Sequence, residues 1–126
     1  MTSTKCNIGE LRKAADEIVT LTITCIGEEI TKSQMVEAVK AIDSIAEKPS
    51  PLLVDAKQSH SVSFEALIEM AKATNVVAVA IYAPSEISQN VAEYIEHFQN
   101  TIGKASYPFK IFSDPMTAKE WLRAFV

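Results

Sequence analysis

Glycine is scarce in this chain of 126 residues, which contains only Gly9, Gly27 and Gly103. Phosphate-binding loops use closely spaced glycines, as in G-x-G-x-x-G or G-x-x-x-x-G-K-[ST], so that the backbone can approach the phosphate. Neither pattern occurs here, and the nucleophile turn G-x-S-x-G is also missing. The sequence therefore argues against a phosphate-cradling loop of these types.

Cysteine is scarce as well. Cys6 and Cys25 form no C-x-x-C pair and have no histidine near them in the sequence. A structural zinc site needs about four cysteine or histidine ligands, so we predict no metal site and no cofactor held by one. The spacing of the two thiols implies no disulfide.

Long apolar runs are missing too. The longest, residues 76–83, suits a strand and is far shorter than the roughly 20 residues of a membrane-spanning helix. The first residues, MTSTKCNIGELRK, lack the apolar centre of a secretory signal peptide. We therefore expect a soluble, cytoplasmic protein without a transmembrane segment.

Positive charge is neither abundant nor concentrated. The chain has 12 Lys and Arg against 16 Asp and Glu, a net charge of -4 and a pI of about 5.2. Binding to nucleic acid needs a basic patch that neutralises phosphates, so we predict no nucleic-acid partner. Apolar residues make up 48% of the chain, an ordinary share for a globular protein, and we interpret residues 1–126 as one domain.

The apolar pattern predicts strands at several places. Residues 18–25, IVTLTITC, alternate between apolar side chains and threonines, which is typical of a strand with one wetter face. The preceding segment, 5–13, is best interpreted as a short hairpin partner. Residues 51–56 and 109–112 also read as strands, and 76–83 is apolar throughout, as in a central strand covered on both faces.

Helix-start signals lie between these strands. Thr31 and Gln34 form a capping box, and Ser63 is placed as an N-cap with an acidic first turn. Further starts are expected at 84–86 and 114–115. Alternating strands and helices predict an α/β domain with right-handed crossovers, which would place helices on one sheet face. The other face then needs cover by a partner, a ligand or a second copy of the chain.

Several stretches carry a resemblance to a known family. They are "PLLVDAK", "SFEA", "VVAVAIYAPS" and the ending "PFKIFSDPMTAKEWLRAF". In this order they resemble STAS domains, the sulfate-transporter and anti-sigma-factor antagonist family, and above all small bacterial STAS/SEC14 or SpoIIAA-like domains of unknown function. The resemblance implies a SpoIIAA-like α/β fold: a mostly parallel sheet of about five strands, about four helices and an N-terminal hairpin.

The resemblance also implies candidate functional residues. Antagonist members carry a serine in a "DSSG"-like motif, which a partner kinase phosphorylates to break binding. The corresponding stretch here is "SHSVSFEA", in which Ser63 falls nearest and Ser61 next; no aspartate precedes Ser63, and no glycine follows Phe64. The fold is shared with CRAL-TRIO lipid-binding domains, which implies an apolar ligand on an open face as an alternative.

Other candidates follow from the residues themselves. Asp55 ends a strand at the edge where α/β proteins bind ligands, so Asp55, Ser59 and His60 form a candidate partner-binding loop. The alternatives are a loop-capping Asp55 and a solvated His60. The late aromatic residues suggest an apolar pocket, with core packing as the other interpretation; its candidates are Tyr107, Phe112 and Trp121.

These observations favour a non-enzymatic module that binds a protein partner near residues 55–63, with serine phosphorylation as a candidate switch. The alternative is a carrier or sensor of a small, lipid-like apolar ligand. An enzyme built on Asp55 and His60 is a third hypothesis, which the lack of a catalytic constellation disfavours. A homodimer through the open sheet face or the threonine face of 18–25 is also a prediction.

Overall fold

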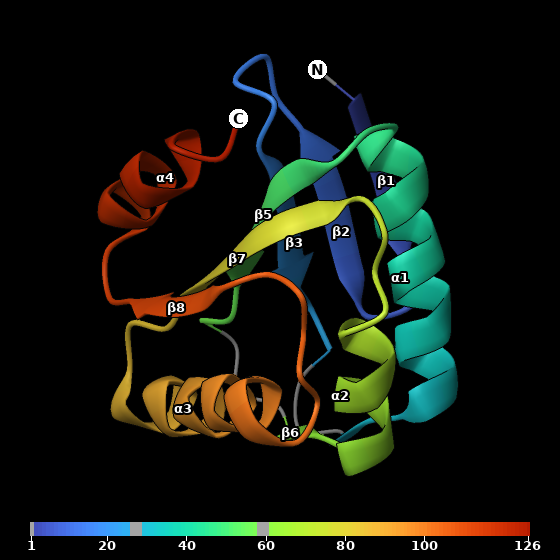
Figure 1. The fold of residues 1–126 in the computed structure, drawn as a ribbon, viewed down its shortest axis with the longest axis vertical. Coiled ribbons are helices and arrows are strands. Elements are labelled where there is room, and N and C mark those ends of the chain that lie inside the picture. The colour runs from blue at the N-terminus through green and yellow to red at the C-terminus, as the bar shows by residue number, and fades with distance from the viewer. Residues whose placement is uncertain (1, 26–28, 58–60) are drawn as a thin grey trace.

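The structure is a computed structural model that describes residues 2–25, 29–57 and 61–126. A six-stranded sheet and four helices make up most of it (Figure 1). The strands of the sheet, in spatial order, are β1 (Thr2–Cys6), β2 (Gly9–Lys13), β3 (Val19–Ile23), β5 (Ser50–Asp55), β7 (Val76–Tyr82) and β8 (Phe109–Phe112). The helices are α1 (Lys32–Ala46), α2 (Phe64–Met70), α3 (Glu86–Thr101) and α4 (Pro115–Arg123), and a small parallel pair joins β4 (Glu29–Ile30) to β6 (Ser61–Val62).

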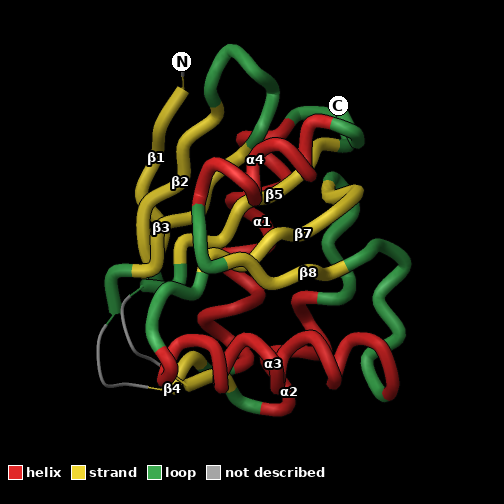
Figure 2. The backbone as a smooth tube through the Cα atoms, turned by 90° about the vertical axis from the view of Figure 1, so that its left-hand side faces the viewer, coloured by secondary structure: helices red, strands yellow, loops and turns green. Residues whose placement is uncertain are grey.

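The sheet is mixed, which corrects the expectation of a mostly parallel one. Strands β3, β5, β7 and β8 run parallel, whereas β1, β2 and β3 form an antiparallel meander, seen side by side in Figure 2. The predicted N-terminal hairpin is present, but the segment before β3 forms two strands, β1 and β2, where one hairpin partner was expected. The reason is a tight turn at residues 7–8, which folds the segment that the alternation pattern left ambiguous.

Two cores lie on opposite faces of the sheet. The larger one packs α1, α2 and α3 against one face, and the smaller one packs α4 against the other, so that Figure 1 shows α1 and α4 on opposite sides of the strands. Strand β7 touches both: Val79 and Ile81 belong to the larger core, Ala78 and Ala80 to the smaller. This double burial explains the apolar sequence of 76–83 and confirms its prediction as a central strand.

The predicted helix starts are confirmed. Thr31 forms its capping box with Gln34, and the Ser63 hydroxyl accepts a hydrogen bond from the Ala66 N–H at 3.1 Å. Each cap satisfies an N–H group that has no partner within its own helix. Ser85 and Asp114 cap α3 and α4 in the same way. No helix in the described ranges is long and apolar enough to cross a bilayer.

Candidate functional site

The face of the sheet opposite α1 is only partly covered, because α4 packs mainly against β5, β7 and β8. Beside α4 the surface is hollowed into a cavity of about 510 Å³, which we call the polar basin. Its floor comes from β2, β3, β5 and β7, and its walls from the first two turns of α4 and the turn between β2 and β3. The lining residues are Glu10, Arg12, Ala14, Asp16, Ile18, Thr20, Thr22, Leu53, Asp55, Lys57, Tyr82, Pro115 and Lys119.

Strand register builds the floor of the basin. Glu10 lies opposite Thr22, Thr22 lies beside Asp55, and Asp55 lies beside Tyr82, so the four form one row across four strands. Neighbouring strands are about 4.8 Å apart, which sets the spacing along this row. Side chains directly across from one another share a sheet face, so the alternation of β3 that buries Leu21 turns Thr22 into the basin.

Most charges in the basin are paired. The Arg12 guanidinium lies 3.7 Å from the Glu10 carboxylate, and the Lys57 ammonium lies 3.5 Å from the Asp55 carboxylate. Asp55 also accepts a hydrogen bond from the Lys57 N–H at 3.3 Å. Asp55 therefore has the loop-capping role that the sequence offered as the alternative, while it also lines the cavity.

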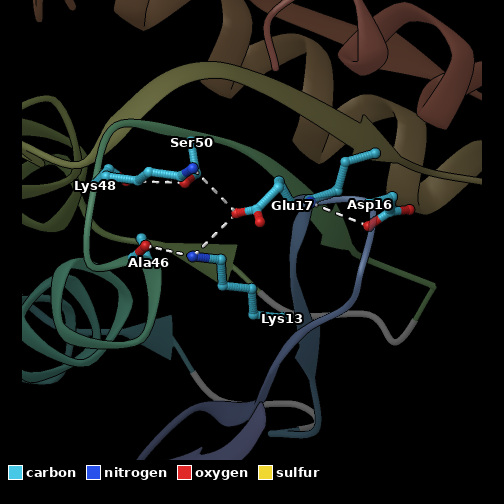
Figure 3. Close-up of polar contacts among 7 residues, drawn as sticks. Lys13, Asp16, Glu17, Ala46, Lys48 and Ser50 are labelled. Carbon is cyan, nitrogen blue, oxygen red and sulfur yellow. Dashed lines mark hydrogen bonds and ion pairs between the residues drawn. The ribbon is translucent and has the colours of Figure 1, made fainter. Parts of the chain in front are cut away.

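One wall of the basin is anchored by ion pairs, shown in Figure 3. The Glu17 carboxylate lies 3.3 Å from the Lys13 ammonium and 3.7 Å from that of Lys48, and Lys13 donates a hydrogen bond to the Ala46 carbonyl at 2.7 Å. Beside it, Asp16 accepts a hydrogen bond from the Ile18 N–H at 3.1 Å. These contacts attach the turn that contains Asp16 to the C-terminal end of α1.

This anchor makes stability depend on pH. The hydrogen bond and charge of Lys13, with the charge of Lys48, hold the pKa of Glu17 below its usual 4.5. A lowered pKa in the folded state contributes stability above the unfolded pKa, and the contribution is lost as the pH falls through the folded pKa. We therefore expect Glu17→Gln to lower the melting temperature slightly at pH 7 and to match the wild type in acid. An equal difference at both pH values, measured by thermal unfolding, would contradict this assignment.

A second surface lies on the helical side of the molecule. Phe64 and Ile68 of α2 and Tyr94 of α3 are 46%, 37% and 47% exposed. The rings of Phe64 and Tyr94 both contact the ring of buried Phe98, with centroids 5.0 and 6.4 Å away. Ile68 follows Phe64 by one helical turn, so it shares that face of α2. We call these three side chains the α2–α3 patch.

The candidate switch serines lie next to the α2–α3 patch. Ser61 is exposed in β6, and Ser63 is half-buried immediately before Phe64, with its hydroxyl engaged as the N-cap of α2. Asp55, by contrast, points into the polar basin on the other face of the sheet. The other members of the candidate loop, Ser59 and His60, lie outside the described residues. The hypothesis of an enzyme built on Asp55 and His60 therefore stays a prediction.

The three aromatic residues of the candidate pocket are not brought together. The rings of Phe112 and Trp121 are in tilted contact in the smaller core, with centroids 5.8 Å apart, whereas Tyr107 belongs to the larger core on the opposite face. The Tyr107 hydroxyl donates to the Met70 carbonyl at 2.6 Å, and burial followed by the charge of Asp43 raises its pKa well above the usual 10. All three serve core packing, the interpretation that the sequence offered beside the pocket.

The apolar interior offers little room for a ligand. Two cavities lie within the larger core, of about 40 and 30 Å³, among side chains such as Leu52, Met70 and Ile95. Ligand sites usually measure roughly 300–1,000 Å³. Among the described residues, no three His, Cys, Asp or Glu side chains are placed to share a metal ion.

Sequence reasoning missed both surfaces in part. The threonine alternation of β3 indicated a wetter face, but nothing local showed that Arg12 and Tyr82 would share it, because that depends on the pairing of distant strands. Helical spacing by itself places Phe64 and Tyr94 on the buried sides of their helices, yet both are about half exposed. Helical spacing shows which way a side chain points, but it does not show whether a neighbouring element packs over that side chain.

Comparison with known proteins supports the fold. A solved structure, an uncharacterized protein of the DUF3478 family with a SpoIIAA-like fold from Shewanella loihica PV-4, covers 97% of this chain and 98% of its own with a TM-score of 0.58. The sequences are 18% identical, so this likeness confirms the predicted SpoIIAA-like fold alone. No curated protein matches the chain. A family model for a domain of unknown function matches residues 13–126, and the chain therefore belongs to that family, DUF7793.

Proposed function

We propose that this SpoIIAA-like domain is a non-enzymatic regulatory module that binds a protein partner through the α2–α3 patch. The observation that carries the proposal is the exposure of Phe64, Ile68 and Tyr94 in one cluster. Aromatic side chains are enriched at the centres of protein interfaces and contribute much of their binding energy. The patch begins one residue after Ser63, which connects it to the candidate switch.

Phosphorylation of Ser63 or Ser61 is the switch that we propose for this surface. A phosphate adds about two negative charges, and at the edge of an apolar interface it must lose its hydration when the partner binds. Glu65 lies directly beyond Phe64 and is exposed, so the new charge would also be close to an existing carboxylate. Both effects oppose binding, as the resemblance to antagonist domains implies.

The patch is tested by quantitative affinity capture from a native lysate, followed by measurement of Kd with the purified partner. Truncation of aromatic residues at an interface centre typically costs about 2 kcal/mol or more, so we expect Phe64→Ala with Tyr94→Ala to weaken binding by at least ~30-fold. Met116→Ala is the matched control, because Met116 is 73% exposed on α4, on the opposite face of the sheet. Unchanged affinity in the double variant, with its fold intact by circular dichroism, would refute the patch.

The same assay tests the switch. Asp and Asn cap helices about as well as Ser, so Ser63→Asp and Ser63→Asn should both keep the stability of α2. Only the Asp variant adds charge, and we expect it alone to lose the partner. Equal binding by the two variants, or mass spectra of the native protein without phosphate on Ser61 and Ser63, would remove the switch and leave the interaction module.

The alternative of a lipid carrier gains no support from the two cavities of the larger core, which are too small for an acyl chain, or from the open face of the sheet, which carries charged and hydroxyl groups. The homodimer remains a prediction, and the pairing of β3 restricts how a second copy could bind. Strand β3 is paired on both sides, by β2 and β5, so a second copy would have to cover the open face rather than extend the sheet at β3.

A further inference from the structure

We propose that the polar basin binds a small hydroxylated organic anion with one acidic group, such as a sugar acid or a sugar monophosphate. This site lies on the opposite side of the sheet from the α2–α3 patch and does not depend on the function proposed for that patch. Its evidence is the size of the cavity, the unpaired hydroxyl groups on its floor and the balance of charge around its rim.

The size of the basin suits a small molecule. Its volume of about 510 Å³ falls within the roughly 300–1,000 Å³ of typical ligand sites. A protein partner is a poorer fit, because the centres of protein interfaces are apolar and depleted in charge. Here the floor carries Glu10, Arg12 and Asp55 together with hydroxyl groups.

Three hydroxyl groups on the floor are available to hydrogen-bond to a ligand. Thr20, Thr22 and Tyr82 are half-buried and line the basin, and none of their hydroxyls hydrogen-bonds to any part of the chain that the structure describes. Thr22 and Tyr82 are two strands apart in the same row, which separates their backbones by about 10 Å. A molecule with hydroxyl groups on successive carbon atoms can span that distance and bond to both ends.

The charges favour one acidic group on the ligand. Arg12 and Lys57 are paired with carboxylates, whereas the half-buried Lys119 on α4 has no carboxylate within 4.0 Å among the described residues. An ammonium without a counter-ion attracts an anion through charge-assisted hydrogen bonds. The carboxylates of Glu10, Asp16 and Asp55 accept hydrogen bonds from ligand hydroxyls but repel a molecule with several acidic groups.

The apolar part of the lining completes the match. Ile18 and Leu53 belong to the smaller core, against which Tyr82 packs, and they add apolar surface to the polar lining of the cavity. Sugar derivatives have the same mixed character, with C–H faces between their hydroxyl groups. A fatty acid, by contrast, would leave the hydroxyls and carboxylates of the floor unpaired, at a cost in free energy.

The test is a titration of the ¹⁵N-labelled chain of residues 1–126, followed by amide chemical shifts. The probes are gluconate, glucose 6-phosphate, glucose and decanoate. We expect saturable shifts around Thr20, Thr22 and Tyr82 with at least one of the two anions, and the anion that binds identifies the acidic group. Glucose should bind at least about tenfold more weakly, because it lacks the partner for Lys119.

Variants localise the binding. Lys119→Met removes the charge and keeps the alkyl stem, and we expect about tenfold weaker binding of the anion. Thr20→Val removes one floor hydroxyl at constant shape and should also weaken it. The matched controls are Lys40→Met on the exposed side of α1 and Thr4→Val, whose register with Leu11 places it on the opposite sheet face; both should bind as the wild type does.

Three results would overturn the proposal. The first is the lack of saturable shifts in the basin with both anions. The second is equal affinity for glucose and the anion, or unchanged affinity in Lys119→Met. The third is tighter binding of decanoate at this site. None of these results bears on the α2–α3 patch, whose partner is measured with different variants on the other face of the sheet.

Discussion

Gly9→Ala is expected to destabilise the protein by roughly 3 kcal/mol or more. A Cβ atom at Gly9 would lie 2.0 Å from the carbonyl oxygen of Thr22 and 2.9 Å from its carbonyl carbon. These are backbone atoms of the neighbouring strand, which cannot rotate away as a side chain can. Strands β2 and β3 would have to separate where Gly9 pairs with Ile23.

The measurement is equilibrium unfolding in urea, with Gly103→Ala as the matched control. A Cβ at Gly103 would meet side-chain atoms instead, Gln99 Oε1 at 2.4 Å and Phe98 Cε1 at 3.0 Å. Side chains can shift, so the control should lose less stability than Gly9→Ala. A Gly9→Ala protein as stable as the control would show that β2 and β3 approach each other less closely than the register implies.

Gly9 also illustrates what a sequence can and cannot reveal. The strands and helices of this chain carry local signals: the threonine alternation of β3, the capping box at Thr31 and the Asp114–Pro115 start of α4. These signals predicted the alternation of strands and helices from β3 onward, and the resemblance to STAS domains implied the SpoIIAA-like fold, but the second N-terminal strand and the β4–β6 pair were not predicted. The close approach at Gly9 has no such local signal, because it is created by a strand ten or more residues further along the chain.

The candidate sites depend on the same non-local information. The row across the polar basin takes one residue from each of four strands: Glu10, Thr22, Asp55 and Tyr82. Each position has an ordinary local interpretation, and only the register makes them neighbours. A shift of one residue in any pairing would turn one of these side chains to the other face. The periodicity within a single strand therefore could not predict the basin. Ser63 was predictable because its capping role is local.

The position of α2, and with it the α2–α3 patch, depends on the carboxylate of Asp43, which no local sequence pattern singles out. Asp43, in the last turns of α1, accepts hydrogen bonds from the Asn75 N–H at 2.8 Å and from the Thr74 hydroxyl and N–H at 3.0 and 3.3 Å. The Asn75 side chain in turn donates to the Asp43 carbonyl at 2.8 Å. Asp43 thereby fixes the turn that leads from α2 into β7.

Asp43→Ala is therefore expected to cost about 2 kcal/mol of unfolding free energy, since hydrogen bonds to a charged group contribute more than neutral ones. Asp43→Asn keeps one acceptor oxygen and should lose less, and Glu37→Ala, exposed on the same helix, should lose almost nothing. The same unfolding assay measures the cost, and hydrogen exchange over residues 64–75 should accelerate in Asp43→Ala.

A double-mutant cycle with Asn75→Ala separates the effect of the bonds between Asp43 and Asn75 from a general loss of helix stability. Because the two residues bond to each other twice, their substitutions should not be additive, with a coupling of about 1 kcal/mol. Asp43→Ala removes the bond from the Asn75 N–H and leaves the Asp43 carbonyl, whereas Asn75→Ala removes only the bond to that carbonyl. The coupling therefore reports the geometry of the turn that both bonds hold. Additive losses, or exchange that accelerates equally in all helices, would mean that Asp43 stabilises α1 alone and leaves the α2–α3 patch to be positioned by the core beneath it.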